Sequence, residues 1–350
     1  MPETINDSSV SKSLFAATKP FAEEIPLKSW WVVISTFVLL IALLVGAAVL
    51  SQWPIRVALS LLGGLVMVRA FILYHDFMHS ALLHESKIGK VIFYTFGLLV
   101  LSPPRYWRYS HNYHHANVGK PVHHQVGPLP QMISDIGSFP LMNTQQWQSA
   151  TFGQRLLYRV VRHPLTILFA YLTVFTIGLC ILPLFKNPKR YWDGALSIIV
   201  HGGMIALLWG FFGFPVVFYT VLLPTTVAAA IGAYMFYAQH NYEGMHVVAS
   251  EEWSYYLGSI HSSSFMKLGP IMRWFSGNIG YHHIHHLNSR IPFYRLPESM
   301  KAIPELQNCT VTTLNPLDIF KCFYLNLWDT ESQKLVGYGE AKKRPVTEKK

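Results

Sequence analysis

Histidine is the residue type in this sequence whose number and spacing point most directly to chemistry. The chain holds 17 histidines, and histidine is both the commonest metal ligand and a costly residue to leave unpaired beside lipid. Three short clusters stand out: HDFMH at 75–79, HNYHH at 111–115 and HHIHH at 282–286. On a helix, positions i, i+3 and i+4 share one face. We therefore expect each cluster, if helical, to aim its imidazoles at one point, and metal binding is the chemistry that this predicts.

The second and third clusters have the same form, HxxHH, and the first has the form HxxxH. The histidines in register with these forms are the candidate ligands: His75, His79, His111, His114, His115, His282, His285 and His286. Eight nitrogens suit two metal ions, each with an open position for O₂ or water. His283 fits the register less well, and we expect it beside the ligands. The alternative is a set of hydrogen-bonded interfacial histidines with no metal, but the repeated spacing favours metal binding.

The composition of the clusters narrows the choice of metal. Imidazole suits iron, zinc, copper and nickel. A structural zinc site needs about four ligands and is usually rich in cysteine, whereas the three cysteines here form no CxxC pair. Bundle-type di-iron proteins use paired Glu-x-x-His motifs, and this chain has one match, Glu243 with His246. An all-histidine pair of sites beside a membrane therefore predicts O₂ chemistry on a lipid.

The elements that must position these clusters are those of a membrane protein. Hydrophobic residues make up 51% of the chain and charged residues 13%, against about 25% charged in soluble domains. Four apolar runs are long enough to span a bilayer: Trp30–Leu50, Ile55–Tyr74, Ala195–Phe214 and Pro215–Tyr237. Arg56 and Arg69 lie near the two ends of the second run, from which they can snorkel to the surface.

Two further apolar segments are expected to lie in the membrane interface or to enter the membrane without crossing it, with a true span at 165–185 as the alternative. The segment 91–101 is too short to span, and 165–185 has basic residues on both sides. The turns at 51–54 and 213–215 carry no Lys or Arg, so the positive-inside rule places them outside and the termini and histidine clusters in the cytosol. The predicted fold is an all-α integral membrane protein with four transmembrane helices in two hairpins, interfacial helices and a cytosolic cap that carries the clusters.

Three regions follow from this pattern: a polar cytosolic segment at 1–29, a membrane domain at 30–300 and a cytosolic extension at 301–350. The formal net charge of +10 suits contact with anionic membrane lipids. No nucleic-acid partner is expected, because the basic residues form no compact patch with interleaved aromatics. The remaining histidines have no spacing argument and are expected to be structural: His84, His123, His124, His163, His201, His246 and His261.

With these clusters in this order, the sequence resembles the membrane fatty acid desaturase family from Tyr74 to Leu296. The context WFSGNIGY at 274–281 and IPFYRL at 291–296 is also similar to that family, and the HxxxH first cluster is similar to its acyl-lipid and Δ12-type members. The resemblance implies two iron ions held by the three clusters, with O₂ as co-substrate. It also implies a further ligand at the end of the last span, which here matches His240.

The resemblance implies a cis double bond introduced into a fatty-acyl chain carried by a lipid, CoA or acyl carrier protein. Because the chain has no fused haem-binding or Cys₄ motif, a separate electron donor is implied, such as ferredoxin or a cytochrome b5-like protein. Arg105, Arg108 and Lys120 could attract an acidic donor. Asp76, Asn112 and Asn278 lie near ligands in the sequence and are candidates to orient them.

Three alternatives stay open. Hydroxylation or ketolation of a carotenoid or sphingolipid would use the same scaffold. A divalent-metal transporter would place its ligands in mid-membrane, whereas the clusters here fall outside the long apolar runs. A histidine-rich metal sensor without turnover is the third, and product analysis separates it from an enzyme.

Overall fold

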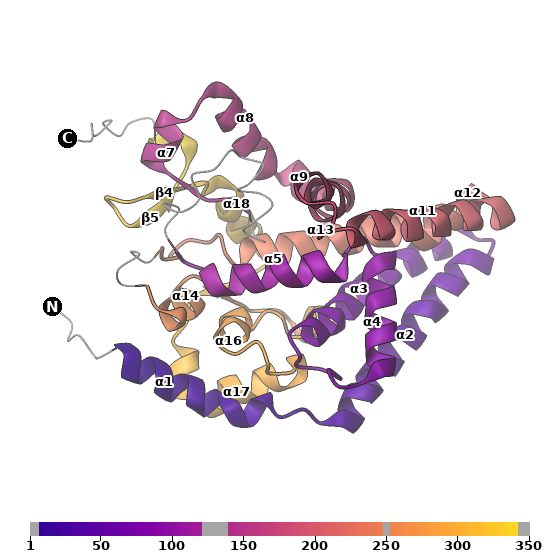
Figure 1. Cartoon of the computed structure of the whole chain (residues 1–350), viewed down its shortest axis with the longest axis horizontal. Helices are drawn as coiled ribbons and strands as arrows, with labels where there is room; N and C mark the ends of the chain where they lie inside the picture. The colour runs from indigo at the N-terminus through magenta and orange to yellow at the C-terminus, as the bar shows by residue number, and fades with distance from the viewer. Residues whose placement is uncertain (1–6, 121–138, 248–252, 342–350) are drawn as a thin grey trace.

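The computed structural model describes residues 7–120, 139–247 and 253–341 (Figure 1). His123 and His124, which we expect to be structural, lie outside these ranges, as does the basic stretch at 342–344. The described part is mostly helical, with five short strands. It confirms the predicted all-α class.

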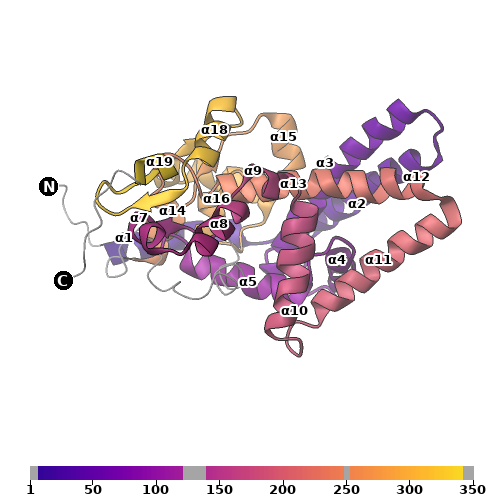
Figure 2. The same cartoon turned by 90° about the horizontal axis from the view of Figure 1, so that it is seen from above.

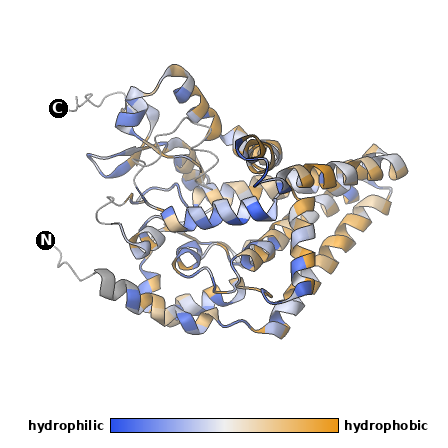
Figure 3. Ribbon diagram, viewed as in Figure 1, coloured by the Kyte–Doolittle hydropathy of each residue, from blue (hydrophilic) through white to orange (hydrophobic). Residues whose placement is uncertain are grey.

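Within the described residues, four helices are long and apolar enough to cross a membrane. They are α2 (Pro26–Val49), α3 (Trp53–Met78), α11 (Asp193–Phe212) and a continuous helix made of α12 (Phe214–Val217), the π-helical turn η4 (Phe218–Leu222) and α13 (Leu223–Ala238). Orange, apolar residues cover these helices in Figure 3. Short turns join α2 to α3 and α11 to α12, and Gly213 makes the second turn with φ +82°. The two predicted hairpins are confirmed.

The segment that we assign to the interface lies crosswise to the spanning helices. It consists of α9 (Pro164–Leu168), the π-helical η3 (Tyr171–Ile181) and α10 (Leu182–Lys186). Figure 1 looks almost along its axis and Figure 2 shows it lengthwise, whereas α13 runs across both views. α4 (Lys87–Leu99) also runs crosswise to α13 in Figure 1. Both segments thus have the orientation expected of interfacial helices.

The remaining elements, apart from α1, form the cap and its connections. Its helices are α5 (Pro104–Asn117), α7 (Thr144–Ser149), α8 (Phe152–Val161), α14 (Tyr255–His261), α15 (Pro270–Phe275), α16 (His282–Leu287), η5 (Phe293–Arg295), α17 (Leu296–Ala302), η6 (Pro304–Gln307), α18 (Pro316–Tyr324) and α19 (Tyr338–Ala341). The N-terminal α1 (Asp7–Thr18) and η1 (Lys19–Ala22) lie along α17 (Figure 1).

Short strands hold the cap loops together. A three-stranded sheet has the order β1-β4-β5, in which β1 (Met142–Asn143) is parallel to β4 (Leu327–Asp329) and β4 is antiparallel to β5 (Lys334–Val336). β2 (Phe265–Met266) pairs in parallel with β3 (Val311–Thr312). These pairings tie the C-terminal region to the segments beside the third histidine cluster.

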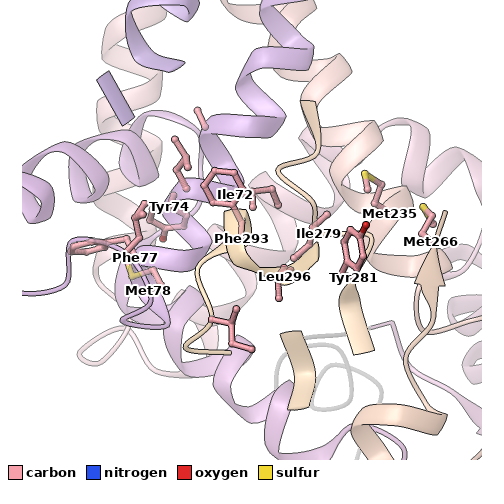
Figure 4. Close-up of a cluster of buried hydrophobic side chains, with 14 of the residues drawn as sticks. Ile72, Tyr74, Phe77, Met78, Met235, Met266, Ile279, Tyr281, Phe293 and Leu296 are labelled. Atoms are coloured by element: carbon pink, nitrogen blue, oxygen red, sulfur yellow. The ribbon is translucent and has the colours of Figure 1, made fainter. Parts of the chain in front are cut away.

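The core that positions the site lies where α3 meets α13 and the cap (Figure 4). Ile72, Phe77 and Met78 of α3 belong to the same buried cluster as Met235 of α13 and Phe293 of the cap. Burying side chains of this size stabilises the fold by roughly 1.5–3 kcal/mol each. This core therefore holds the end of α3, and the first histidine cluster with it, against the cap.

Arg69 corrects one expectation from the sequence. The prediction that it snorkels to the membrane surface is wrong, because its side chain is buried with 7% exposed. Its Nη1 donates to the carbonyl of Trp274 at 2.6 Å, and its Nε donates to Thr36 Oγ1 at 3.2 Å. Its guanidinium also lies 4.4 Å from the centre of the Trp274 ring. Arg69 therefore fastens the cap to α3 instead of reaching for headgroups.

Candidate metal centre

Four parts of the chain carry the nine candidate ligands to one place. His75 lies in the last turn of α3, which continues through the first cluster, and His79 is the residue that ends this helix. α5 carries the second cluster and α16 carries the third. His240 follows α13. The second and third clusters lie within helices, whereas His79 and His240 lie at helix ends.

Five histidines form the first group, called here the five-histidine group: His75, His79, His111, His115 and His285. His111 Nε2 lies 3.0 Å from His75 Nε2 and 3.2 Å from His115 Nε2. His115 Nε2 in turn lies 3.1 Å from His285 Nε2. The ring centre of His79 is 4.5–5.0 Å from those of the other four. All five could direct one nitrogen at one ion.

Four histidines form the second group, the four-histidine group: His114, His240, His282 and His286. His240 Nε2 lies 2.8 Å from His282 Nε2, 3.0 Å from His114 Nε2 and 3.2 Å from His286 Nε2. The ligand atoms within each group all lie within 4.8 Å of one another. The structure thus brings together the eight clustered histidines and His240.

The expectation that each cluster aims at a single point holds for the first cluster, whose His75 and His79 share the five-histidine group, but is wrong for the other two. His111 and His115 belong to the five-histidine group, whereas His114 belongs to the other. Each helical residue turns the side chain by about 100°, so i+3 and i+4 point to opposite sides of residue i and diverge from each other by about 100°. The third cluster divides in the same way, with His282 and His286 in one group and His285 in the other. An HxxHH helix therefore serves two neighbouring sites.

The spacing of the nitrogens fits a bound metal. A metal–imidazole bond of about 2.1 Å places nitrogens about 3.0 Å apart at adjacent octahedral corners and about 3.4 Å apart at tetrahedral ones. The eight Nε2–Nε2 contacts in the two groups measure 2.8–3.2 Å. Imidazole nitrogens at this spacing match a metal's coordination shell.

Two imidazole nitrogens in these groups are left with lone pairs that a metal ion could bind. His240 Nδ1 lies 3.0 Å from the carbonyl of Ser262, which can accept but not donate, so the proton of a neutral His240 is on Nδ1 and its Nε2 presents a lone pair. That lone pair faces three other Nε2 atoms. In the five-histidine group, the buried His79 Nε2 has no hydrogen-bond partner among the described residues. A cation at each centre would satisfy these atoms.

The protonation state also suits metal binding. Burial, reinforced by repulsion from neighbouring imidazoles, lowers the pKa of His111, His115, His282 and His286 well below the usual value for histidine. Burial lowers the pKa of His240 to about 4. Near neutral pH these side chains are therefore uncharged, as a metal ligand must be.

Groups beside the ligands have distinct partners. Asp76 Oδ1 lies 3.2 Å from His75 Nδ1, as a ligand-orienting residue would. Asn278 instead donates to the carbonyl of Phe293, and Asn112 is exposed on α5. His283 Nε2 lies 3.0 Å from the carbonyl of Leu306, and His283 is in neither group. Of the three candidates, Asp76 is thus the one placed to orient a ligand.

The other described histidines lie outside both groups. His201 bonds Tyr171 Oη and the carbonyl of Leu99, and His163 accepts from the backbone at the start of α9. His84 lies 3.7 Å from its neighbour Glu85. His246 donates its backbone N–H to the carbonyl of His261. These contacts agree with structural roles.

A contact that the sequence analysis missed fixes the helix of the second cluster. Asp193, at the start of α11, accepts a hydrogen bond of 2.7 Å from the backbone N–H of Arg105. Arg105 lies in the first turn of α5, where a carboxylate satisfies a free N–H and complements the helix dipole. The Pro103-Pro104 pair predicts a helix start here, but nothing in the local sequence indicates a partner 88 residues away.

Four apolar helices able to span a membrane, together with two adjacent groups of buried histidines that could hold metal ions, define a membrane protein with a candidate all-histidine metal centre. The family model described as "Fatty acid desaturase" matches residues 51–309. The chain belongs to the fatty acid desaturase family, whose members are oxidoreductases.

Curated relatives agree with this assignment. A fatty acid desaturase of Bacillus subtilis (strain 168) is 26% identical over 304 residues, covering 85% of this chain and 81% of the relative. An sn-1 acyl-lipid omega-3 desaturase (ferredoxin) of Nostoc sp. (strain 36) is 25% identical, covering 76% and 72%. A Delta(12) fatty acid desaturase of Calendula officinalis is 22% identical, covering 78% and 71%.

Proposed function

We propose that this protein is an O₂-dependent fatty-acyl desaturase that binds two iron ions through the nine histidines and introduces a cis double bond into the acyl chain of a membrane lipid. The observation that carries the proposal is the pair of adjacent all-histidine groups at the cap end of the spanning helices. The relatives that act on acyl lipids support the substrate class.

The iron ions, when bound, would supply the activation of O₂ that removes two hydrogens from neighbouring methylenes of the chain. In balance, the substrate gives up two hydrogens, a donor gives two electrons, two protons are taken up, and O₂ leaves as two waters. The protein's own part is to hold nine uncharged imidazoles in place and to exclude bulk water from them. None of the five histidines of the first group is more than 9% exposed, which supports that role.

A pocket beside the four-histidine group is the proposed place where the substrate methylenes lie. It is lined by His114 and His240 of that group and by the apolar side chains of Phe139, Leu141 and Phe236, and its wall also contains polar side chains, among them Lys120, Arg162 and Asn241. Apolar walls bind a hydrocarbon chain, and a fixed pocket limits which carbons come close to the metals. Of the nine candidate ligands, His114 and His240 line this pocket, so the four-histidine group is the one that faces it.

The donor is proposed to be a small acidic redox protein such as ferredoxin, as the name of the Nostoc relative suggests. The cap, both termini and the histidine groups are proposed to lie in the cytosol, because the outer turns carry no basic residue. A soluble donor would then reach the cap directly.

Expression in a host with a simple lipid profile tests the function. With ferredoxin and its reductase supplied, fatty-acid methyl-ester analysis should show a new monounsaturated or polyunsaturated chain. His114→Ala should abolish it, and His261→Ala, a histidine outside both groups, should retain it. A hydroxylated product would show that the protein is a hydroxylase and not a desaturase. An unchanged lipid profile would contradict the proposal. Metal analysis should find two irons per chain, and zinc without iron would contradict the mechanism.

A further inference from the structure

Asp76 is a buried carboxylate with both oxygens engaged, and its side chain touches a candidate ligand. Its exposed fraction is 1%. Oδ1 lies 3.2 Å from Nδ1 of His75, and Oδ2 accepts a hydrogen bond of 2.7 Å from the backbone N–H of Phe293. His75 turns its other nitrogen, Nε2, to the five-histidine group. The carboxylate therefore stands directly behind one imidazole of that group.

No Lys or Arg nitrogen within the described ranges lies within 4.0 Å of this carboxylate. The cation seven residues earlier on α3, Arg69, is occupied by Thr36 and the carbonyl of Trp274. A buried charge without compensation is costly. An imidazole that carries a metal ion on Nε2 has a more acidic Nδ1–H and would donate a stronger hydrogen bond, which would offset that cost.

Among the described residues, no carboxylate oxygen lies within 4.0 Å of a side-chain nitrogen of any other candidate ligand. His240 donates from Nδ1 to a neutral carbonyl, that of Ser262. The buried Nδ1 atoms of four further ligands have no hydrogen-bond partner among the described residues: His115, His282, His285 and His286. In the five-histidine group, His75 thus has a carboxylate beside its Nδ1. In the four-histidine group, the atom beside Nδ1 of His240 is the uncharged carbonyl of Ser262.

We propose that Asp76 is a positioning residue that fixes the tautomer of His75 and makes the five-histidine group the tighter and more electron-rich of the two metal sites. This inference rests on the proposed function. A carboxylate behind a ligand raises the basicity of the imidazole and favours the more oxidised state of the metal. The two irons would therefore differ in affinity and in midpoint potential.

The second oxygen of Asp76 extends this role to the third cluster. Phe293, which donates to it, lies six residues after Leu287, the end of α16. The carbonyl of Phe293 accepts from Asn278 Nδ2, four residues before His282. A chain of three hydrogen bonds therefore runs from His75 through Asp76 to the segments on both sides of the third cluster. Asp76→Asn retains a side-chain oxygen that can accept from the N–H of Phe293, so it removes the charge behind His75 and keeps this connection to the third cluster.

The test is a chelator competition on the full-length protein in detergent, loaded anaerobically with Fe²⁺, combined with redox titration of each iron. Asp76→Asn keeps the size of the side chain and removes the charge. We expect one of the two irons to be bound about 10- to 100-fold more weakly and its midpoint potential to rise, with the other iron unchanged. Asp329→Asn is the matched control, because it neutralises another buried carboxylate, which accepts from Ser332 Oγ at 2.6 Å and lies on β4, a strand that carries no candidate ligand. Both irons should stay as in the wild type.

Equal weakening of both irons, or wild-type binding in Asp76→Asn, would overturn the role of Asp76. Wild-type protein that binds no iron would instead contradict the proposed function, so the two failures are distinct. If Asp76→Asn does not fold, Asp76→Glu can be used in its place, and the two irons of this one variant are compared with each other. It keeps the charge but displaces it by one methylene, and we expect one iron to leave before the other during chelation. Simultaneous loss would overturn the inference.

Discussion

His115 and His286 stack face to face, with ring centres 4.1 Å apart and ring planes inclined by 22°. His115 belongs to the five-histidine group and His286 to the four-histidine group. The contact joins α5 to α16, which carry the second and third clusters. The two candidate metal sites therefore share a wall formed by these two stacked rings, and we expect a substitution of either ring to affect both sites.

Truncating His115 should affect both sites, whereas truncating His79 should affect one. The recorded ring contacts of His79 are with Trp107 and with members of its own group. We expect His79→Ala to lose one iron per chain. His115→Ala should lose one and weaken the other by about tenfold or more, as changes beside a ligand commonly do. Iron content measured across a chelator series distinguishes the two patterns, and identical curves for the two variants would contradict a shared wall.

Gly277 is a position where a side chain should damage the fold. Its φ is +52°, and an added Cβ would lie 2.9 Å from Ile72 Cγ2. Because a left-handed backbone conformation costs a non-glycine residue about 1 kcal/mol or more, and the contact adds to this, Gly277→Ala should lower the unfolding temperature in detergent. Gly269→Ala is the control, since an added Cβ there meets no atom within 4 Å. Equal unfolding temperatures for the two variants would show that the cap is not fixed to α3 at this point.

The residue types and spacing predict eight of the nine candidate ligands, because ligands carried on a helix recur at helical intervals. His240 stands alone in the sequence and entered through the resemblance to a family. The division into two groups escaped prediction, because it depends on how α5 and α16 face each other. The helical repeat predicts that residues i+3 and i+4 point in different directions. Which of the two lies beside the same metal site as a histidine of the opposing helix depends on how the two helices pack.

The spans and turns were also predictable, since long apolar runs have few other uses. The prediction that Arg69 snorkels is wrong, although its position near the end of an apolar run is compatible with snorkelling. Its true partner, the carbonyl of Trp274, lies 205 residues away. The same holds for Asp193 and the N–H of Arg105. Such contacts come from tertiary packing, and no local sequence pattern predicts them.

Cysteine labelling can test the orientation in the membrane. In a chain without its native cysteines, Gln52→Cys places a thiol in the exposed turn before α3, and Glu305→Cys places one on the cap. An impermeant maleimide added to intact cells should label the first, because the turn is predicted to face outward. The second should react after the membrane is opened. The reverse pattern would place the candidate metal sites on the outer face and exclude a cytosolic donor.

Arg108 offers a test of how electrons reach the site. Its side chain is exposed on α5, the helix that carries three candidate ligands, and an acidic donor would be attracted to it. We expect Arg108→Glu to lower kcat/KM for ferredoxin by about tenfold at low ionic strength and by less at high salt, because salt screens exposed charges. Lys301→Glu, an equal charge change on exposed α17, should leave this rate constant close to that of the wild type.

A chemical reductant separates docking of the donor from damage to the site. When dithionite replaces ferredoxin, single-turnover product formation by Arg108→Glu should match the wild type, since a small reductant needs no docking surface. If both reductants are slowed equally, Arg108 acts on the metal centre itself, for instance through His79, whose pKa is lowered by burial, by His75 and to a smaller extent by the charge of Arg108. An effect independent of salt would likewise remove α5 from the docking surface, because encounter steered by charge must weaken as ionic strength rises.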